Sequence, residues 1–199
     1  MARTEEKGFL PGGDMKKKLI SNRKIQAKLV LTAGEIDRDY AGREIVIICN
    51  LNGAFMVTAD LVRLLRTPLR VDFIRYTSYK GAGSTGTVTG SMDLTEDISG
   101  KPVILVEDII DTGLTVNKIR EDLAGLHPSE MRVFSLLYRK GGMTPDYGCF
   151  EIEDGFVFGY GLDLDGSYRE LRDIWRVLPL FSTVFSANSD CPENLLFPC

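Results

Sequence analysis

The stretch VILVEDIIDTGLT, from Val103 to Thr115, begins as a short apolar run and continues into three carboxylates and a Thr-Gly-Leu-Thr turn. Its first four residues predict a buried strand. The apolar positions Val116, Ile119 and Leu123 follow at helical spacing and predict a helix directly after the turn. A buried strand that leads at once into a helix is the repeating unit of α/β proteins, so this stretch favours that fold class.

The same alternation recurs on both sides of this stretch. Apolar runs at residues 45–49, 71–76 and 133–137 predict three further strands. Strands that are apolar throughout belong to parallel sheets that are covered on both faces. We therefore expect a doubly wound, mostly parallel sheet, in which ligands bind at the carboxyl ends of the strands.

Two more helices are predicted in the first third of the chain. Ser21 can cap the first, which ends near Ala41 and Gly42. The apolar residues of this helix recur at three- and four-residue spacing, at Ile25, Leu29, Ala33, Ile36 and Tyr40. The second helix follows Gly53, and its predicted buried face consists of Phe55, Ala59, Val62 and Leu65.

Composition narrows the class of protein. The 199 residues, of which 44% are hydrophobic, suffice for one core, so we expect a single domain with an accessory lobe. A net charge of -4 argues against non-specific nucleic-acid binding. No apolar run approaches the roughly 18 residues of a membrane span, and the polar start lacks the apolar core of a signal sequence. We therefore expect a cytoplasmic protein that binds neither nucleic acid nor membrane.

Cysteine and histidine exclude several kinds of site. The four cysteines match neither a CxxC zinc pair nor a dense disulfide framework, and we interpret them as reduced thiols: Cys49, Cys149, Cys191 and Cys199. Pairing of Cys191 with Cys199 across a short loop is the minority alternative. His127 is the only histidine, which excludes histidine-rich zinc sites and argues against a Ser-His-Asp triad.

Residues 80–100 are rich in Gly, Ser and Thr and predict a long mobile loop with a weak hairpin. Within this loop, Gly81 to Gly86 reads GAGSTG and matches the GxGxxG pattern of dinucleotide-binding proteins. That pattern requires a helix to begin at the third glycine, whereas residues 87–90, TVTG, favour extended chain. We reject a dinucleotide-binding site here.

The turn after the strand from Val103 predicts a sugar phosphate site. Backbone amides at a helix start, the flexible Gly113 and the hydroxyls of Thr112 and Thr115 form a cradle for a phosphate. Glu107 and Asp108 beside it would repel a bare anion. Their presence is explained if the ligand places ribose hydroxyls there as donors to these carboxylates, with Mg²⁺ balancing the charge.

This segment resembles a known family. VEDIIDTGLT is similar to the phosphoribosyl pyrophosphate (PRPP) signature of type I phosphoribosyltransferases, and its wording resembles the hypoxanthine-guanine branch. The resemblance runs from about Ile20 to Pro179. It implies a phosphoribosyltransferase domain at residues 20–179, with a small hood lobe and a mobile lid loop. A polar lead-in at 1–19 and a tail of unknown role at 180–199 flank this domain.

The family resemblance also implies an activity. A member of this branch transfers the phosphoribosyl group of PRPP to a 6-oxopurine base in purine salvage, uses Mg²⁺ and works as a homodimer or homotetramer. The transition state is oxocarbenium-like, and pyrophosphate leaves as its magnesium complex. A preorganised site stabilises the transition state most where its charges face the charges that develop there, which here are the cationic sugar carbon and the leaving anion.

Roles for the PRPP site follow from the resemblance. Glu107 and Asp108 would hold the ribose hydroxyls, and Asp111 would lie near purine N7 as proton acceptor or donor. The phosphate cradle would be Thr112, Gly113, Leu114 and Thr115. Pyrophosphate would bind to the backbone of Leu51, Asn52 and Gly53, where relatives often have Leu-Lys-Gly and a non-proline cis peptide, and to Arg169. The metal ligands would be Glu107, Asp108 and Asp163.

The remaining implied residues concern the lid and the base. Ser78 and Tyr79 would open the loop that closes over the reactants and excludes water. Phe156 and Val157 would stack on the purine and meet its edge, with Asp163 beside it. Where relatives have the lysine that reads the 6-oxo group, this chain has Arg139, so either Arg139 or, after a one-residue shift, Lys140 takes that role.

Two alternative functions remain open. One is a regulator that keeps the PRPP pocket only as a sensor. The other is a phosphoribosyltransferase for xanthine or another base, such as a pyrimidine. Retention of Asp111, of the lid and of Arg169 favours catalysis over sensing.

Overall fold

The structure is a computed structural model that describes residues 7–9, 15–78 and 88–178. Tyr79 and residues 80–87 of the predicted lid loop, as well as the tail at 180–199 with Cys191 and Cys199, lie outside the described residues.

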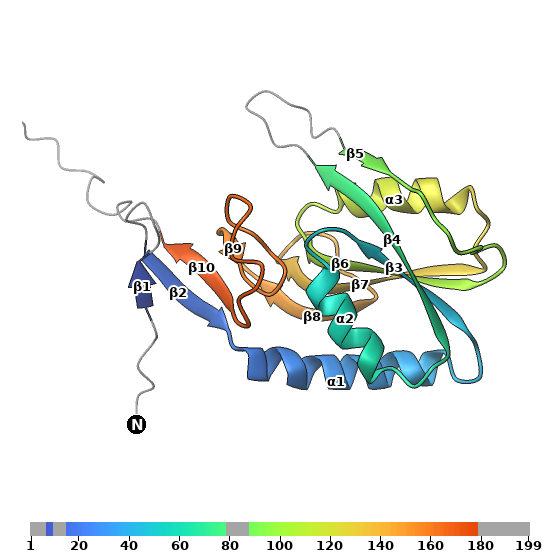
Figure 1. Ribbon diagram of the computed structural model, residues 1–199, viewed down its shortest axis with the longest axis horizontal. Helices are drawn as coiled ribbons and strands as arrows, with labels where there is room; N and C mark the ends of the chain where they lie inside the picture. The colour runs from blue at the N-terminus through green and yellow to red at the C-terminus, as the bar shows by residue number, and fades with distance from the viewer. Residues whose placement is uncertain (1–6, 10–14, 79–87, 179–199) are drawn as a thin grey trace, which may run out of the picture.

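The larger of two sheets has six strands and is mostly parallel (Figure 1). The strand order is β5-β4-β3-β6-β7-β8, with β5 antiparallel to β4 and every other neighbouring pair parallel. The strands are β3 (Ile45–Asn50), β4 (Leu69–Ser78), β5 (Val88–Ser91), β6 (Pro102–Ile110), β7 (Glu130–Arg139) and β8 (Tyr147–Ile152). All six residues of β3 are buried, as expected of a strand covered on both faces.

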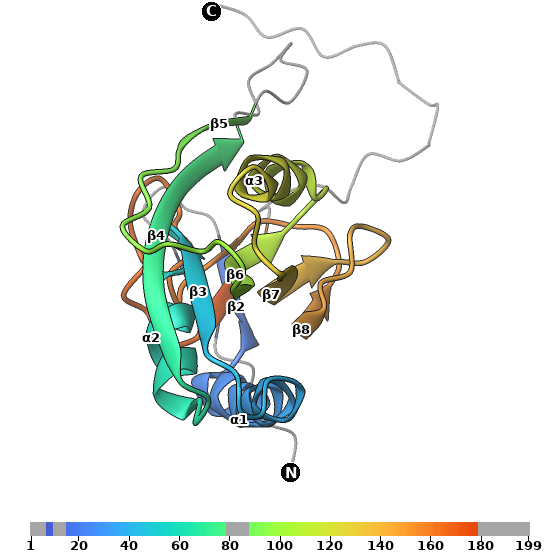
Figure 2. The same cartoon turned by 90° about the vertical axis from the view of Figure 1, so that its right-hand side faces the viewer.

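Helices cover both faces of this sheet (Figure 2). Helices α1 (Asn22–Asp39) and α2 (Phe55–Leu64) pack on one face, in a core that includes Ile47 and Val106. Helix α3 (Leu114–Ala124) packs on the other face, in a core that includes Ile48 and Leu105. Alternate residues of β3 and β6 thus point into opposite cores, which confirms the predicted doubly wound α/β fold.

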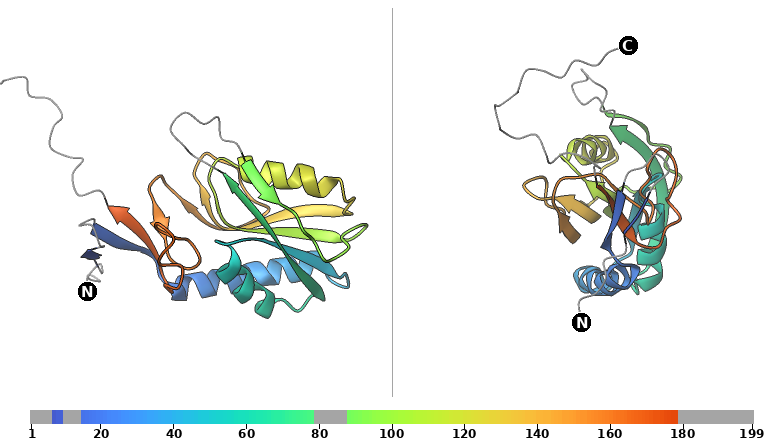
Figure 3. Two further views of the ribbon diagram at one scale, coloured as in Figure 1. Left: turned by 45° about the horizontal axis from the view of Figure 1, so that its top comes forward. Right: turned by 90° about the vertical axis from the view of Figure 1, so that its left-hand side faces the viewer.

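A smaller antiparallel sheet joins the two ends of the described chain. Its strand order is β1-β2-β10-β9, with β1 (Lys7–Phe9), β2 (Met15–Ile20), β10 (Ile174–Leu178) and β9 (Val157–Phe158). It lies beyond one end of the large sheet (Figure 3). Residues 15–19, which the sequence placed in a polar lead-in, therefore form most of a paired strand.

The two N-terminal helices depart from the prediction in detail. Ser21 is the N-cap residue of α1, but its side chain makes no capping hydrogen bond. Asp173 Oδ1 accepts the first amide of the helix, that of Asn22, at 2.7 Å. The predicted buried face of α2 is wrong at Ala59 and Phe55, which are exposed, the latter by 38%, whereas Val62 and Leu65 are half-buried and pack against the core. The fully buried residues of α2 are Val57, Thr58 and Leu61.

The described cysteines, Cys49 and Cys149, are buried free thiols, as expected. Burial raises the pKa of each to about 11, so both are unreactive at neutral pH. No helix among residues 7–9, 15–78 and 88–178 is long and apolar enough to cross a membrane.

Candidate functional site

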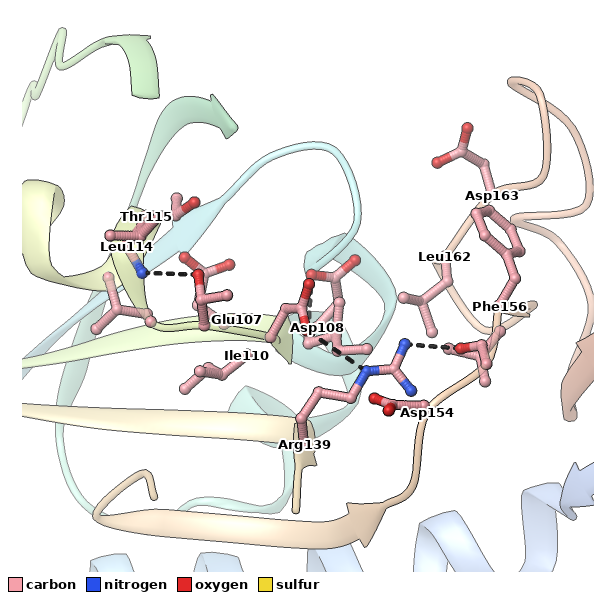
Figure 4. Close-up of a pocket in the computed structure, with 17 residues that line it drawn as sticks. Glu107, Asp108, Ile110, Leu114, Thr115, Arg139, Asp154, Phe156, Leu162 and Asp163 are labelled. Atoms are coloured by element: carbon pink, nitrogen blue, oxygen red, sulfur yellow. Dashed lines mark hydrogen bonds and ion pairs between the residues drawn. The ribbon is translucent and has the colours of Figure 1, made fainter. Parts of the chain in front are cut away.

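A cleft of about 670 Å³ opens where β6 ends and α3 begins (Figure 4). One wall is the segment from Glu107 to Val116, and the other comes from the end of β7 and from the segment around β9. Most of the predicted site residues line it: Glu107, Asp108, Asp111, Thr112, Gly113, Leu114, Thr115, Arg139, Phe156, Val157 and Asp163. The carboxyl end of a central strand is where ligands bind in doubly wound folds.

Glu107 lies at the deep end of this cleft and is only 4% exposed. β6 continues to Ile110, so the acidic pair belongs to the strand and not to the turn after it. Burial and the neighbouring charge of Asp108 raise the pKa of Glu107 well above its ordinary value. Asn50 Nδ2 opposes this shift by donating to both carboxylate oxygens, at 3.1 and 3.2 Å.

Asp108 points to the opposite side of β6 and meets the loop after β3. Its Oδ1 accepts the amide of Ile109 at 2.8 Å. Burial raises the pKa of Asp108 to about 6, although Arg169 favours its charged form. The carboxylate packs so closely on Gly53 that a Cβ built there would lie 1.6 Å from Asp108 Oδ2. A side chain at position 53 would therefore displace either the Asp108 carboxylate or the loop.

The loop of Leu51, Asn52 and Gly53 has the geometry that the family resemblance led us to expect, with a cis peptide between Leu51 and Asn52. A Cβ at Gly161 would lie 2.1 Å from the carbonyl oxygen of Gly53. The loop is therefore held between Asp108 and the segment after β9. The Asn52 side chain accepts a hydrogen bond from Arg75 Nη2 at 3.1 Å, so a cation lies next to the position where relatives have lysine.

Arg139 and Lys140, the two candidate readers of the base, lie on different sides of the chain. The Arg139 side chain reaches into the cleft toward Asp154 and Phe156 (Figure 4). Its Nε lies 3.7 Å from Asp111 Oδ1. Lys140 is exposed and does not line the cleft, and its amide donates to Ile152.

Arg139 also fixes the segment that precedes β9. Its Nη1 donates to the carbonyl of Glu153 at 2.6 Å and its Nη2 to that of Gly155 at 2.7 Å. This segment presents Phe156, which is 53% exposed at the mouth of the cleft, while Val157 is buried. An exposed aromatic ring beside a fixed guanidinium suits a flat, polar-edged ligand.

The residues of the predicted phosphate cradle lie at the start of α3. Gly113 adopts φ 86°, which favours glycine, and lies at the N-cap position. Thr112 Oγ1 accepts the amide of Leu114 at a long 3.4 Å. Thr112 is exposed and Thr115 half-buried, and both line the cleft. The helix start can accept an anion.

Asp163 and Arg169 pair with each other at the far wall. Arg169 Nη2 lies 2.8 Å from Asp163 Oδ1, and its Nη1 donates to the carbonyl of Gly161 at 2.7 Å. Arg169 itself does not line the cleft. Within the described part of the chain, no three His, Cys, Asp or Glu side chains gather as a metal site, so Glu107, Asp108 and Asp163 do not form one cluster.

Of the remaining predicted residues, the two assigned to the lid are not placed in the cleft by the described part of the chain. Ser78 ends β4, and Tyr79 lies outside the described residues. Six residues line the cleft without having been predicted as site residues, among them Asp154 and Leu162. Asp154 and Leu162 lie in the segments next to Phe156 and Asp163, and no pattern of their own marks them in the sequence.

Comparison with known proteins agrees with this geometry. Residues 17–165 match the family model described as phosphoribosyl transferase domain. A hypoxanthine-guanine phosphoribosyltransferase of Streptococcus pneumoniae is 35% identical over 163 residues, covering 79% of this chain and 91% of the relative. A hypoxanthine-guanine-xanthine phosphoribosyltransferase of Tritrichomonas foetus is 36% identical, covering 79% and 89%. The crystal structure of a hypoxanthine-guanine phosphoribosyltransferase from Bacillus anthracis matches with a TM-score of 0.74 and 36% identity, covering 81% and 97%. The chain therefore belongs to the phosphoribosyltransferase family, in its hypoxanthine-guanine branch.

Proposed function

We propose that this protein transfers the 5-phosphoribosyl group of PRPP to a 6-oxopurine, hypoxanthine or guanine, and releases pyrophosphate in purine salvage. The observation that carries the proposal is the buried acid pair of β6, which lies in one cleft with the anion-accepting start of α3. A ligand that bears hydroxyls next to a phosphate satisfies both halves of this cleft.

In this proposal each end of PRPP has its own partners. The 5-phosphate binds at Thr112, Gly113, Leu114 and Thr115, and the ribose hydroxyls donate to Glu107 and Asp108. Pyrophosphate lies against the backbone of Leu51, Asn52 and Gly53, next to Arg169. The contact of Gly53 with Asp108 supports this arrangement, because it brings the loop directly beside the proposed ribose site.

Mg²⁺ fits this set of donors. Magnesium in proteins commonly takes one or two carboxylates and completes its shell with water and substrate phosphates. Glu107 and Asp108 offer two such carboxylates, whose raised pKa values show that a nearby cation would stabilise their charged forms. Asp163 is the proposed ligand of a second ion. The metal would balance the charge of the leaving pyrophosphate.

The base binds between Phe156 and the β6–α3 turn. Phe156 stacks on the ring, Val157 meets its edge, and Arg139 donates to the 6-oxo group. Arg139 has five N–H donors, of which its contacts with Asp111, Glu153 and Gly155 engage three, so donors remain for a ligand. Asp111 exchanges the proton of purine N7 as the new bond to the sugar forms.

A related base is the second candidate. The similarity to a relative that is named for xanthine as well keeps a xanthine-accepting enzyme open. A sensor without catalysis is disfavoured, because the proposed acceptor Asp111 lines the cleft together with the PRPP site.

The test is a panel of hypoxanthine, guanine, xanthine, adenine and uracil with PRPP and Mg²⁺, following pyrophosphate release and nucleotide formation. We expect turnover with hypoxanthine and guanine. Tight PRPP binding without turnover of any 6-oxopurine would favour the sensor, and turnover of xanthine or uracil alone would favour the second candidate.

We further infer a homodimer or homotetramer in the cytoplasm, with the small sheet as the hood lobe of the phosphoribosyltransferase domain. Light scattering of the purified protein tests the oligomeric state, and a monomer at micromolar concentration would contradict it.

A further inference from the structure

Asn50 is a buried polar residue that none of the roles above uses. It ends β3, is 6% exposed and is not among the residues that line the cleft. A buried amide is costly unless its donors and acceptor are bonded. Its hydrogen bonds therefore indicate what it does.

The orientation of the Asn50 amide is fixed by the backbone of Tyr76. Asn50 Oδ1 accepts the Tyr76 amide at 2.8 Å, and Nδ2 donates to the Tyr76 carbonyl at 3.2 Å. The regular pairing of β3 with β4 ends at Asn50 and Ile74. Beyond it, the Asn50 side chain takes the place of a backbone partner for Tyr76 on β4. The oxygen and nitrogen of the amide cannot exchange places without losing both bonds.

This orientation points the second Nδ2 hydrogen at Glu107. Both carboxylate oxygens lie within 3.2 Å of Nδ2. Glu107 is almost fully buried, and Asn50 is the one hydrogen-bond donor to its carboxylate among the described residues. The rotation of this carboxylate is therefore set by Asn50.

Tyr76 is held from two further elements. Its hydroxyl donates to Asp122 Oδ2 of α3 at 2.8 Å. Gly90 of β5 packs on its ring so closely that a Cβ there would lie 2.4 Å from Tyr76 Cγ. Hydrogen bonds thus link α3, β4 and β3 to the carboxylate on β6.

We infer that Asn50 is a positioning residue, which acts through Glu107 to orient the carboxylate that receives the ribose hydroxyls of PRPP. The inference rests on the proposed function for the identity of the substrate. It assigns Asn50 no contact with either substrate. Loss of Asn50 should therefore affect the use of PRPP and spare the binding of the base.

The test is Asn50→Leu, with Ser135→Ala as matched control. Ser135 is fully buried, pairs in register with Glu107 and donates to the Leu137 carbonyl at 2.5 Å. We expect Asn50→Leu to lower kcat/KM for PRPP by about tenfold to hundredfold, as for a lost hydrogen bond to a charged group. KM for hypoxanthine should stay within about twofold, and Ser135→Ala should change neither constant.

A second variant covers the case in which Asn50→Leu fails to fold. Asn50→Asp keeps the size of the side chain and its acceptor for the Tyr76 amide, but presents an oxygen to Glu107. Its kcat/KM for PRPP should fall at least as strongly as that of Asn50→Leu. Unchanged efficiency in a folded variant, or equal losses for both substrates, would overturn the inference. If the wild-type protein binds PRPP but transfers it to no base, the proposed function fails, and the PRPP Kd of the same variants still tests Asn50.

Discussion

Arg139 Nε lies 3.7 Å from Asp111 Oδ1, so the proposed reader of the base and the proposed proton acceptor form an ion pair across the cleft. The same guanidinium holds the carbonyls of Glu153 and Gly155. A lysine, with one ammonium group, could not make these three contacts in the same fork geometry. Arginine at this position therefore links three parts of the base site.

Paired substitutions distinguish whether Arg139 or Lys140 reads the base. We expect Arg139→Met to lower kcat/KM for hypoxanthine by about tenfold to hundredfold, because a charged donor to the base is lost. Arg139→Lys should retain more activity than Arg139→Met. Lys140→Met, at an exposed position outside the cleft, should be close to wild type. The reverse ranking of the two Met variants would assign the role to Lys140.

Asp111→Asn tests the proton acceptor. The amide keeps the shape of the side chain but cannot take the N7 proton, so we expect kcat to fall by about tenfold to ten-thousandfold, the range of a positioned acid or base. The Kd for PRPP, measured by calorimetry, should change much less. Equal losses in kcat and in PRPP affinity would assign Asp111 to ligand binding instead.

The large sheet was predictable because its signals are local. β3 and β6 contain continuous apolar runs, and the buried residues of α3 recur at helical spacing. The small sheet was not predicted, because β2 reads MKKKLI and carries no apolar alternation. Its pairing with β10 joins residues about as far apart as the described chain allows, which no local pattern records.

The residues of the site also differ in how far the sequence alone could predict them. Glu107 to Thr115 is one contiguous motif, so its chemistry could be inferred from residue types alone. Asn50 meets Glu107 across 57 residues of sequence and looks like the polar end of an ordinary strand. The choice between Arg139 and Lys140 depended on which of the two side chains points into the cleft. Successive residues of an extended chain point to opposite sides, so a shift of one residue in the alignment would exchange the two.

Gly53→Ala tests the contact of the pyrophosphate loop with Asp108. A Cβ at this position would overlap Asp108 Oδ2, so the loop or the carboxylate must shift. We expect kcat/KM for PRPP to fall by more than about tenfold, since a displacement of a binding group by about 1 Å can lower the rate by about a hundredfold. Gly34→Ala is the control, because Gly34 lies inside α1 with nothing within 4 Å. That change should keep activity and raise stability by about 1 kcal/mol. Wild-type kinetics for Gly53→Ala would contradict the close packing.

The raised pKa of Asp108 predicts a pH-dependent effect of Asp108→Asn on stability. Between the ordinary pKa of 3.8 and about 6 in the folded protein, the native state binds more protons than the unfolded state. Asp108 therefore lowers the free energy of unfolding as pH rises through this window. The substituted asparagine side chain carries no charge, so the variant should have a Tm above that of wild type by several degrees at pH 7.5, but by about 1 °C or less at pH 4. Thermal unfolding of both proteins without PRPP or Mg²⁺, measured at each pH, tests this. A difference in Tm that is the same at both pH values would show that folding does not raise the pKa of Asp108 above its ordinary value.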